Sequence, residues 1–418
     1  MSGIIRPAQL PLHVSRFTAT SCVGTGNDAL RAALHERRSG LARDGFAESD
    51  LDTWLGVVAG IDQVKIEPPL APFDCRNNRL AQLGMQADGF LETVREAVAR
   101  HGAHRVGVIL GTSTGGVLET ELAYRHRLPE TGALPPGFDY RATHSPYSVV
   151  DFVRGLTGAR GPSTAISSAC SSSAKVFASA ARLIAAGLID AAIVGGVDSL
   201  CQTTVYGFNS LELLSAQPCR PYGADRNGIS IGEAAAFALL ERWPGRPDDD
   251  ALALVGYGES SDAHHMSTPH PEGLGAQIAM RNALSTAGLE PSDIDYINLH
   301  GTATPSNDFA ESLAVSNVFG ATPCSSTKGA TGHTLGAAGA LEAVISMLAL
   351  RHHEMPAGIH ATQVDPALNV HYLLENRVSE MRYVLSNSFG FGGTNCSLIF
   401  ANVAGVSDLL RTRDQEAV

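Results

Sequence analysis

Short runs of apolar residues recur along the chain, and each leads into a cluster of Gly, Ser and Thr and then a stretch of small residues. The run at 105–110 (RVGVIL) ends in such a cluster. Residues 163–167 lead to Cys170, after which apolar and small residues recur at helical spacing to about Gly187. Residues 191–197 (AAIVGGV) then have the pattern of a buried strand. This order predicts strand–helix–strand units, an α/β protein and a parallel sheet.

The second half of the chain repeats this scheme. The run at 294–299 (IDYINL) is followed by His-Gly-Thr-Ala-Thr, which is similar to the Gly-Thr-Ser-Thr at 111–114, about 190 residues earlier. A second helix of small residues is predicted over 335–350, in the place that the first such helix holds in its half. A repeat of this length indicates duplicated α/β halves, which we expect to span 1–250 and 251–418, with the chemistry at the carboxyl ends of strands.

The composition favours a large folded core and excludes several functions. Of the 418 residues, 44% are hydrophobic and 17% are charged, so wholesale disorder is not expected. The net charge of −12 argues against nucleic-acid binding, because such a chain has no general attraction for phosphate backbones. The best candidate for a membrane span, 185–200, is interrupted by Asp190 and Asp198, and no export signal is apparent. These features predict a soluble, cytoplasmic protein.

Cys170 differs from the other six cysteines, which are spread thinly along the chain. None of the seven forms a Cys-x-x-Cys pair, so neither a disulfide framework nor a zinc ribbon is expected. Cys170 lies in SSACSSS, at a predicted strand-to-helix junction. Unpaired backbone N–H groups and the positive end of the helix dipole stabilise a thiolate at such a position. A packed core cysteine is the alternative interpretation.

Two histidines and a lysine are the next candidates. His300 follows an apolar strand, and His333 precedes the second helix of small residues. Each alone has the alternative of a structural histidine, but together they occupy equivalent ends of successive strand–loop–helix units. Two imidazoles can converge there on one thiol. Lys328 lies in an otherwise uncharged Ser/Thr/Gly segment, which does not fit a solvated surface lysine.

A glycine-rich segment near the end of the chain, 387–395 (NSFGFGGTN), has glycines on both sides of Phe391. They allow a sharp turn that presents backbone N–H groups to an oxyanion. A tight turn between two strands is the alternative. The histidine pairs at 264–265 and 352–353 are adjacent in sequence, so their side chains diverge and metal ligation is not expected.

Six segments taken together resemble the β-ketoacyl-acyl-carrier-protein synthases, and more narrowly the elongating enzymes with a Cys–His–His triad. The resemblance covers about residues 100 to 402. It implies a thiolase-like fold, a duplicated five-layer αβαβα arrangement that usually forms a dimer. The segments are SSACSSSA around Cys170, RPYGADRNGISIGEAA from Arg220, SSDAHHMSTP from Ser260, HGTATPSND from His300, STKGATGHTLGAAGALEA from Ser326 and NSFGFGGTN from Asn387.

Carried over by position, the resemblance makes Cys170 the nucleophile that takes the acyl chain from the carrier's phosphopantetheine thioester. His300 and His333 are expected to bind the malonyl thioester carbonyl and promote loss of CO₂, while Lys328 holds charge and orientation around them. No metal or other cofactor is required by this chemistry. The further implied positions are Phe391, Gly390 and Gly392 at the oxyanion hole and gate, Thr302 and Thr304 on the pantetheine arm, and Glu311 (a structural acid) and Phe389 beside the substrate.

An acidic carrier protein is the partner that the resemblance implies. An enzyme of charge −12 needs a local basic patch to bind it. Arg76 and Arg79, three apart on a predicted helix, match a carrier-docking segment of the family, and Arg125 and Arg127 are expected to contribute from the other side. Ordinary solvated arginines are the alternative for each.

The predicted acyl pocket has unusually polar segments, Ser113 and Thr114 in one loop and 143–147 (THSPY) in another. Such a lining suits an unsaturated or otherwise non-standard chain. Two pathways therefore stay open: fatty acid elongation, and a specialised polyene or polyketide ketosynthase that works with a non-catalytic chain-length partner. A non-catalytic subunit usually lacks the nucleophile, and a thiolase using coenzyme A needs a second cysteine, so both of these classes fit less well.

Overall fold

One mixed sheet runs through the molecule. The structure is a computed structural model that describes residues 10–43, 45–46 and 49–416. Strands from the first 250 residues occupy one end of the sheet and strands from the rest occupy the other, and β1 pairs with β9 where they meet. In spatial order the strands are β13 (His371–Tyr372), β11 (Pro323–Ser325), β10 (Tyr296–Asn298), β15 (Tyr383–Gly390), β16 (Thr394–Asn402), β9 (Leu252–Ser261), β1 (Leu12–Ser21), β8 (Ala234–Arg242), β6 (Ala191–Asp198), β4 (Val106–Gly111) and β5 (Ser163–Ile166).

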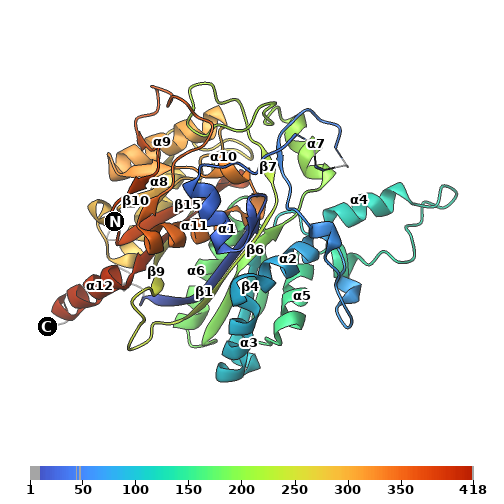
Figure 1. Ribbon diagram of the computed structural model, residues 1–418, viewed down its shortest axis with the longest axis horizontal. Helices are drawn as coiled ribbons and strands as arrows, with labels where there is room; N and C mark the ends of the chain where they lie inside the picture. Colours follow the sequence, from blue (N-terminus) through green and yellow to red (C-terminus); the bar gives the residue numbers. More distant parts are fainter. Residues whose placement is uncertain (1–9, 44, 47–48, 417–418) are drawn as a thin grey trace.

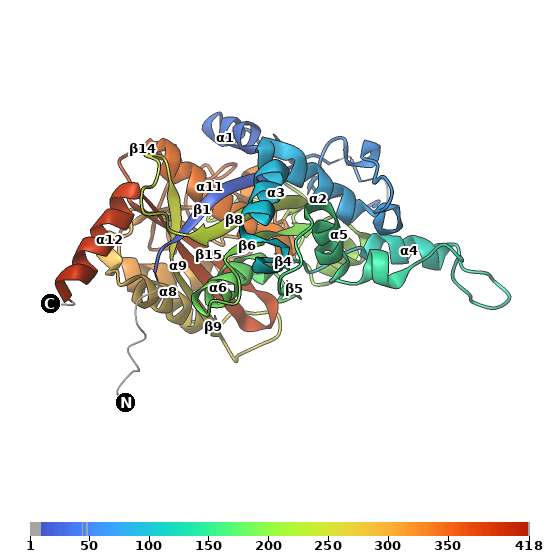
Figure 2. The same cartoon turned by 90° about the horizontal axis from the view of Figure 1, so that it is seen from below.

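Helices cover both faces of each half of the sheet and give the expected αβαβα layering (Figures 1 and 2). The central layer is α6 (Ser172–Ala185) and α11 (Ala338–His352), which contact strands of both halves. The outer layers are α2 (Arg76–Gln86), α3 (Phe90–His101) and α5 (Ser148–Thr157) on the first half, and α8 (Leu274–Ala287), α9 (Pro305–Phe319) and α12 (Val403–Glu416) on the second.

Shorter elements complete the described chain. Two small sheets pair β3 (Leu55–Gly56) with β7 (Ile231–Gly232) and β12 (Glu354–Met355) with β14 (Arg377–Val378), while β2 (Gly24–Thr25) pairs with β1. The remaining α-helices are α1 (Asn27–His35), α4 (Val117–Arg125), α7 (Gln202–Ser210) and α10 (Lys328–Thr331). Single turns of tighter or wider helix lie at Ile61–Gln63, Ala71–Phe73, Ala87–Gly89, Ala103–Arg105, Tyr140–His144, Pro291–Asp293, Leu335–Ala337 and Phe391–Gly393.

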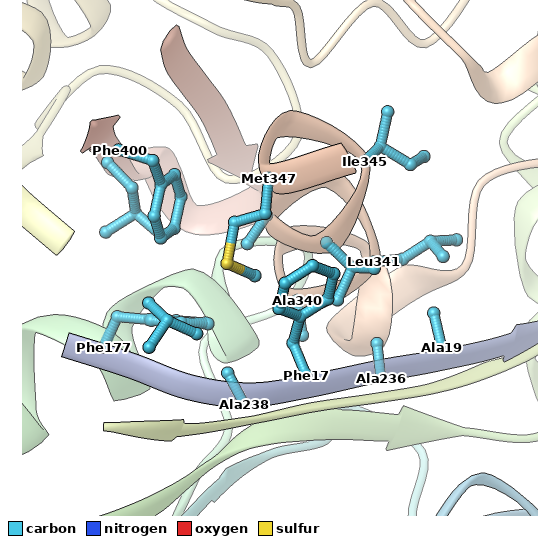
Figure 3. Packing of buried hydrophobic residues seen from close by; sticks show 14 of the residues in the cluster. Phe17, Ala19, Phe177, Ala236, Ala238, Ala340, Leu341, Ile345, Met347 and Phe400 are labelled. Carbon is cyan, nitrogen blue, oxygen red and sulfur yellow. The ribbon is translucent and has the colours of Figure 1, made fainter. Parts of the chain in front are cut away.

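The core sits around the central helices. Figure 3 shows Met347 and Leu341 of α11 directed toward Phe17 of β1, with Phe177 of α6 and Phe400 of β16 beside them. The rings of Phe177 and Phe400 meet edge to face at 5.9 Å. The many small residues have a steric reason, because the two central helices approach so closely that a Cβ added at Gly339 would lie 2.6 Å from the backbone nitrogen of Ala174.

The predicted strands and helices around the site are confirmed to within two or three residues, but the parallel sheet is only partly correct. β4 pairs in parallel with β5 and β6, and β10 with β11 and β15. The strands in the middle of the sheet are antiparallel. One cause is the tight turn at Phe391–Gly393, because so short a connection between β15 and β16 joins only antiparallel neighbours. The division at residue 250 stays a prediction.

The most membrane-like segment is not the one expected from the sequence. Residues 335–352 are long and apolar enough to cross a membrane, and 89% of that stretch is buried inside the protein. It contains α11, which the neighbouring strands and helices surround. The stretch is therefore a core helix of the fold.

A buried ion pair fixes α2 to the centre of the molecule. Arg76, at the start of α2, donates from Nη2 and Nε to the carboxylate of Glu233 at 2.6 and 3.0 Å. Glu233 has no exposed side-chain surface and also accepts the backbone N–H groups of Val58 and Leu200, each at 2.9 Å. These four hydrogen bonds to one buried carboxylate connect α2 and the segments at Val58 and Leu200 to Glu233.

We expect Arg76→Ala to lower the free energy of unfolding by about 3–5 kcal/mol, because the Glu233 carboxylate would stay buried without its cation. The matched control is Arg79→Ala on the same helix, whose pair with Asp74 is partly exposed and is worth about 0–1 kcal/mol. Urea unfolding of the two variants checks this. Equal losses for both would contradict the assignment of Arg76 to the core.

Candidate active site

Cys170 lies in a sharp turn between β5 and α6. The residue before it, Ala169, has φ of 51°, a left-handed conformation that non-glycine residues rarely adopt. The turn is closed by the N–H of Ser172, which donates to the carbonyl of Ala169. Cys170 is 6% exposed and lines a cavity that is partly open to solvent. The local strain places a single thiol at the tip of the central helix.

The two histidines converge on this thiol, although both come from the second half of the chain. His333 Nε2 lies 3.1 Å from Cys170 Sγ. The rings of His300 and His333 are nearly perpendicular, with centroids 5.3 Å apart. One ring nitrogen of each histidine and the sulfur all lie within 4.8 Å of one another. The structure therefore brings together the three side chains that the sequence singled out.

Hydrogen bonds to the far ring nitrogens determine where each imidazole carries its proton. The backbone N–H of Leu335 donates to His333 Nδ1 at 3.2 Å. Lys328 Nζ lies 3.4 Å from His300 Nδ1 and also donates to the His300 carbonyl. Since both Nδ1 atoms face donors, the neutral rings carry their protons on Nε2. Each ring thus presents an Nε2–H group in the site.

Burial keeps both imidazoles neutral and the thiol protonated. Burial and then the charge of Lys328 hold the pKa values of His300 and His333 well below the ordinary histidine value. Burial raises the pKa of the Cys170 thiol to about 11, against the opposing effects of the Lys328 charge and the Phe391 N–H group. The expectation of a stabilised thiolate is therefore not met in the resting site, because loss of solvent outweighs the helix terminus.

Lys328 is buried, as its sequence context predicted, and it has a partner that the sequence analysis missed. Its Nζ forms an ion pair with Glu342, a residue of α11. Burial raises the pKa of Glu342 to about 7, and the Lys328 charge opposes this. The signal in the sequence was a single acidic residue in an apolar helical stretch. The pair keeps an ammonium group next to His300.

Glu311 shapes the His300 loop and does not line the cavity at Cys170, which fits the expected structural acid and not a direct contact with substrate. Its carboxylate accepts the N–H groups of His300 and Gly301 at 2.8 and 2.7 Å. It is 1% exposed and is absent from the residues that line the cavity at Cys170. Burial raises its pKa to about 7. Glu311 acts on the site through the backbone that carries His300.

The glycine-rich turn between β15 and β16 packs against Cys170. A Cβ added at Gly390 would lie 3.2 Å from the backbone nitrogen of Cys170, so only glycine fits there comfortably. Gly392 has φ of 80° and donates its N–H to the carbonyl of Met266 at 2.7 Å. The backbone N–H of Phe391 faces the Cys170 sulfur. Both readings of this segment hold, since it is a tight turn and also presents an N–H group at the thiol.

The cavity at Cys170 has a volume of about 620 Å³, including space that opens to solvent. Thr302, Thr304 and Phe389 line it as expected, and the two threonine hydroxyls lie 2.9 Å apart. The sequence analysis missed an apolar wall made by Phe208, Leu213 and Ile229; the ring of Phe208 lies 5.7 Å from that of Phe391. The remaining lining comes from Asp262, Ser267, Thr268, Pro269, Ser306, Asn307, Gly390, Gly392, Gly393 and Asn395, with the three side chains described above.

Two loops expected in the acyl pocket do not reach this cavity. Ser113 and Thr114 donate to the buried carboxylate of Asp198 instead. Residues 143–147 lie in and after the turn Tyr140–His144, where His144 contacts Thr120 at 2.5 Å. Neither segment lines the space around Cys170. The hydroxyl groups of Ser113 and Thr114 and the ring of His144 form hydrogen bonds with other residues of the protein instead.

The prediction that Arg76 docks the carrier is wrong, because its guanidinium is buried against Glu233. Arg79 is half-buried and holds Asp74 through two hydrogen bonds of 2.6 and 2.9 Å, so its charge is already balanced. Arg125 and Arg127 are exposed, at and beyond the end of α4. Of the four arginines, only these two are exposed.

The distances within the Cys170–His300–His333 cluster suit a metal ion, but the positions of the imidazole protons do not. A metal would need the lone pair of each Nε2, and the ring proton would then move to Nδ1. At His333 that proton would point at the N–H of Leu335, and at His300 at the Lys328 ammonium. The donors on the far side therefore favour an organic substrate oxygen over a metal.

Two family models together match most of the chain. The N-terminal domain of the β-ketoacyl synthases matches residues 23–244, and the C-terminal domain of the same family matches residues 252–362. A mitochondrial 3-oxoacyl-[acyl-carrier-protein] synthase from Arabidopsis thaliana is 40% identical over 265 residues, which cover 59% of this chain and 58% of that enzyme. The 3-oxoacyl-[acyl-carrier-protein] synthase 2 of Staphylococcus aureus is 34% identical over 74% of this chain and 81% of its own.

The solved structures agree with this assignment. The ketosynthase ApeO from Xenorhabdus doucetiae, in complex with its chain length factor ApeC, has a TM-score of 0.85 and is 39% identical to this chain, with 94% of this chain and 98% of the other covered. The two matched domains contain the thiol, both histidines and the Lys328 segment. The chain therefore belongs to the β-ketoacyl synthase family and is a condensing acyltransferase with the thiolase-like α/β fold.

Proposed function

We propose that this synthase loads an acyl chain onto Cys170 and lengthens it by two carbons from malonyl-acyl-carrier protein, with release of CO₂. The observation that carries the proposal is the geometry of the site. One buried thiol contacts the Nε2–H of a neutral imidazole, and a second neutral imidazole with the same tautomer stands beside it. The first half of the chain (1–250) supplies the nucleophile, and the second half (251–418) supplies both imidazoles.

In the first step the Cys170 sulfur attacks the thioester carbonyl of the acyl carrier. The carbonyl oxygen becomes an oxyanion, and we assign its stabilisation to the N–H groups of Cys170 and Phe391, which lie at the Gly390 turn. The C–S bond to pantetheine breaks, and the proton of the Cys170 thiol leaves with the pantetheine sulfur. Because the resting thiol is protonated, its ionisation belongs to the substrate-bound state.

In the second step the malonyl thioester carbonyl accepts hydrogen bonds from His300 and His333. The carboxylate leaves as CO₂, and its bonding electrons form an enolate whose oxygen stays between the two Nε2–H groups. The enolate carbon attacks the acyl carbonyl on Cys170, and the C–S bond to the enzyme breaks. The Cys170 thiolate that this releases takes up one proton from solvent, which restores the resting thiol. Thr302 and Thr304 offer hydroxyl groups to the pantetheine arm along the same cavity.

The acyl chain has an apolar wall to lie against. Phe208, Leu213 and Ile229 stand on one side of the cavity, with Phe389 and Phe391 near the thiol. Phe391 is half-buried in a turn that carries glycines with left-handed φ, so we assign it the role of a gate between the entrance and the chain. This wall suits a flat, unsaturated chain as well as a saturated one.

A specialised polyene or polyketide pathway is the pathway we favour over general fatty acid elongation. ApeO, to which the chain is similar over 94% of its length, was solved together with a chain length factor. We propose a cytoplasmic dimer in which the partner is a second copy or such a non-catalytic subunit. The acidic carrier would approach Arg125 and Arg127 on the exposed end of α4.

Two features of the first half support assembly with another subunit. β5 is the last strand of the sheet, and its outer edge has no strand partner among the described residues. Close to it, α4 and the loop 126–139 project from the body of the molecule (Figures 1 and 2). Exposed apolar side chains gather on and next to this arm, namely Tyr124, Leu128, Tyr140 and Tyr147.

Intact-mass analysis after exposure to acyl carriers tests the proposed reaction. Wild-type protein is expected to gain the mass of one acyl chain, and Cys170→Ala to gain none while keeping its fold. Addition of malonyl carrier should then release CO₂ and a 3-oxoacyl product two carbons longer. His300→Ala should slow decarboxylation by about 10²–10³-fold, because one preorganised donor to the enolate is lost.

The acyl panel should contain saturated and polyunsaturated chains of equal length. Faster loading of the polyunsaturated chain supports the specialised pathway, and faster loading of the saturated chain contradicts it. An absence of any acyl adduct on wild-type protein would contradict the proposed reaction as a whole.

The pH dependence of thiol alkylation tests the protonated resting state. Reaction of Cys170 with iodoacetamide should accelerate about tenfold per pH unit from about pH 7 to about pH 9, because only the thiolate reacts and the thiol pKa lies at about 11. Cys170→Ala supplies the background from the other thiols. A rate that levels off near neutral pH would show a low-pKa thiolate and contradict this description of the site.

Sedimentation analysis of variants tests the proposed assembly. The wild-type protein is expected to be a dimer, and the double variant Leu128→Asp, Tyr140→Asp is expected to shift it to monomer by placing charges in the interface. The control is Val378→Asp, which changes an even more exposed apolar residue on β14, away from the arm. An unchanged dimer in the double variant would exclude the arm as the contact surface.

A further inference from the structure

The search for groups that the proposed reaction does not use leads to Asp198, the last residue of β6. It is completely buried, and its carboxylate accepts hydrogen bonds from six donor groups in two separate segments. Among the described residues no Lys, Arg or His forms an ion pair with it. The donors are Thr112 Oγ1 (2.5 Å), Ser113 N (2.9 Å), Ser113 Oγ (2.6 Å), Thr114 N (3.0 Å), Thr114 Oγ1 (2.9 Å) and Gly336 N (2.6 Å).

The donor at Gly336 connects this carboxylate to the turn that carries His333. Leu335, between the two, has φ of 53°, an unfavourable left-handed conformation for a branched side chain. In this conformation two successive N–H groups point in different directions. The N–H of Leu335 donates to His333 Nδ1, and the N–H of Gly336 donates to Asp198.

The approach of the two groups leaves no room for a side chain. A Cβ added at Gly336 would lie 2.6 Å from both Asp198 Oδ2 and the nitrogen of Ser113. Ser113 Oγ also lies 3.2 Å from the Gly336 nitrogen. The turn after His333 is therefore pressed against the carboxylate and its ring of donors, which fixes the turn in place.

We infer that Asp198 is a positioning residue for His333: by holding the Gly336 N–H it keeps Leu335 in its strained conformation, so that the His333 Nε2–H stays directed at the reacting atoms. The inference rests on the proposed function of His333 as a donor to the malonyl thioester. Asp198 itself touches neither the cavity nor Cys170.

The negative charge of Asp198 has a cost at the Cys170 thiol. Burial is the main cause that raises the pKa of the Cys170 thiol, and the nearby negative charge of Asp198 adds to it. A neutral side chain would avoid this. Only a carboxylate, however, offers acceptors alone to six inward-pointing donors, since an amide would turn its own NH₂ group toward some of them.

The variant Asp198→Asn tests this directly. We expect the kcat for decarboxylation of malonyl carrier to fall by about 10- to 100-fold with little change in KM, because binding is kept while the donor is misplaced. The matched control is Asp190→Asn, just before the same strand, which breaks a partly exposed pair with Arg105 and should leave kcat unchanged. An unchanged kcat in folded Asp198→Asn would overturn the inference.

A double variant separates positioning from general stability. If Asp198 acts through His333, adding Asp198→Asn to His333→Ala should cost little further activity, within about threefold, whereas independent effects would multiply. Multiplying losses would overturn the inference. If Asp198→Asn does not fold, Ser113→Ala with Thr114→Val removes two of the side-chain donors, and the same fall in kcat without a change in KM is expected.

The two proposals fail in different ways. A wild-type protein that does not decarboxylate malonyl carrier contradicts the proposed function. An active wild type with equally active Asp198→Asn and Ser113→Ala, Thr114→Val variants contradicts only the role of Asp198.

Discussion

The proposed chemistry of this protein depends on the orientation of two buried, neutral imidazoles. A buried histidine can carry its proton on either nitrogen, and only one choice makes it a donor in the cavity. The backbone N–H of Leu335 and the Lys328 ammonium occupy the two Nδ1 atoms and decide that choice. Burial then keeps both rings uncharged. Without these contacts the same residues at the same distances would not present the two Nε2–H donors that the proposed reaction requires.

Buried carboxylates supply much of the rigidity that this orientation needs. Glu311 holds the backbone at His300, Asp198 holds the turn after His333, and Glu342 holds Lys328. Each lies far from water and accepts hydrogen bonds that would otherwise be unmade. Loops at the ends of strands are usually the mobile part of an α/β protein. Here their backbone N–H groups are tied to fixed acceptors.

The duplicated architecture explains how residues far apart in the chain share one site. α6 and α11 form the middle layer and pack closely because their facing residues are small, as at Gly339 and Ala174. The thiol comes from the turn before α6, and His333 comes from the turn before the stretch that contains α11. Packing the two helices side by side thus brings the nucleophile of one half to the imidazoles of the other.

Local patterns in the sequence determined a large part of this description. The apolar runs at β4, β6 and β10, the two helices of small residues, and Cys170, His300, His333 and Lys328 at the ends of these units all follow from periodicity and residue type. The physical reason is that burial of a strand or helix depends mainly on its own apolar residues. The order of the strands could not be predicted from these local patterns. The antiparallel pairing of β1 with β8 and of β9 with β16 joins segments that are distant in sequence.

The tertiary structure decided the state of the charged groups. Arg76 looked like a surface residue of an amphipathic helix, but Glu233, 157 residues away, makes it part of the core. Asp198 seemed only to interrupt an apolar run, and its donors come from residues 85 and 138 positions away. The protonated thiol of Cys170 likewise reflects its surroundings more than its helix terminus. Side-chain charge and protonation depend on solvent exposure and on partners distant in sequence, so the folded chain alone sets them.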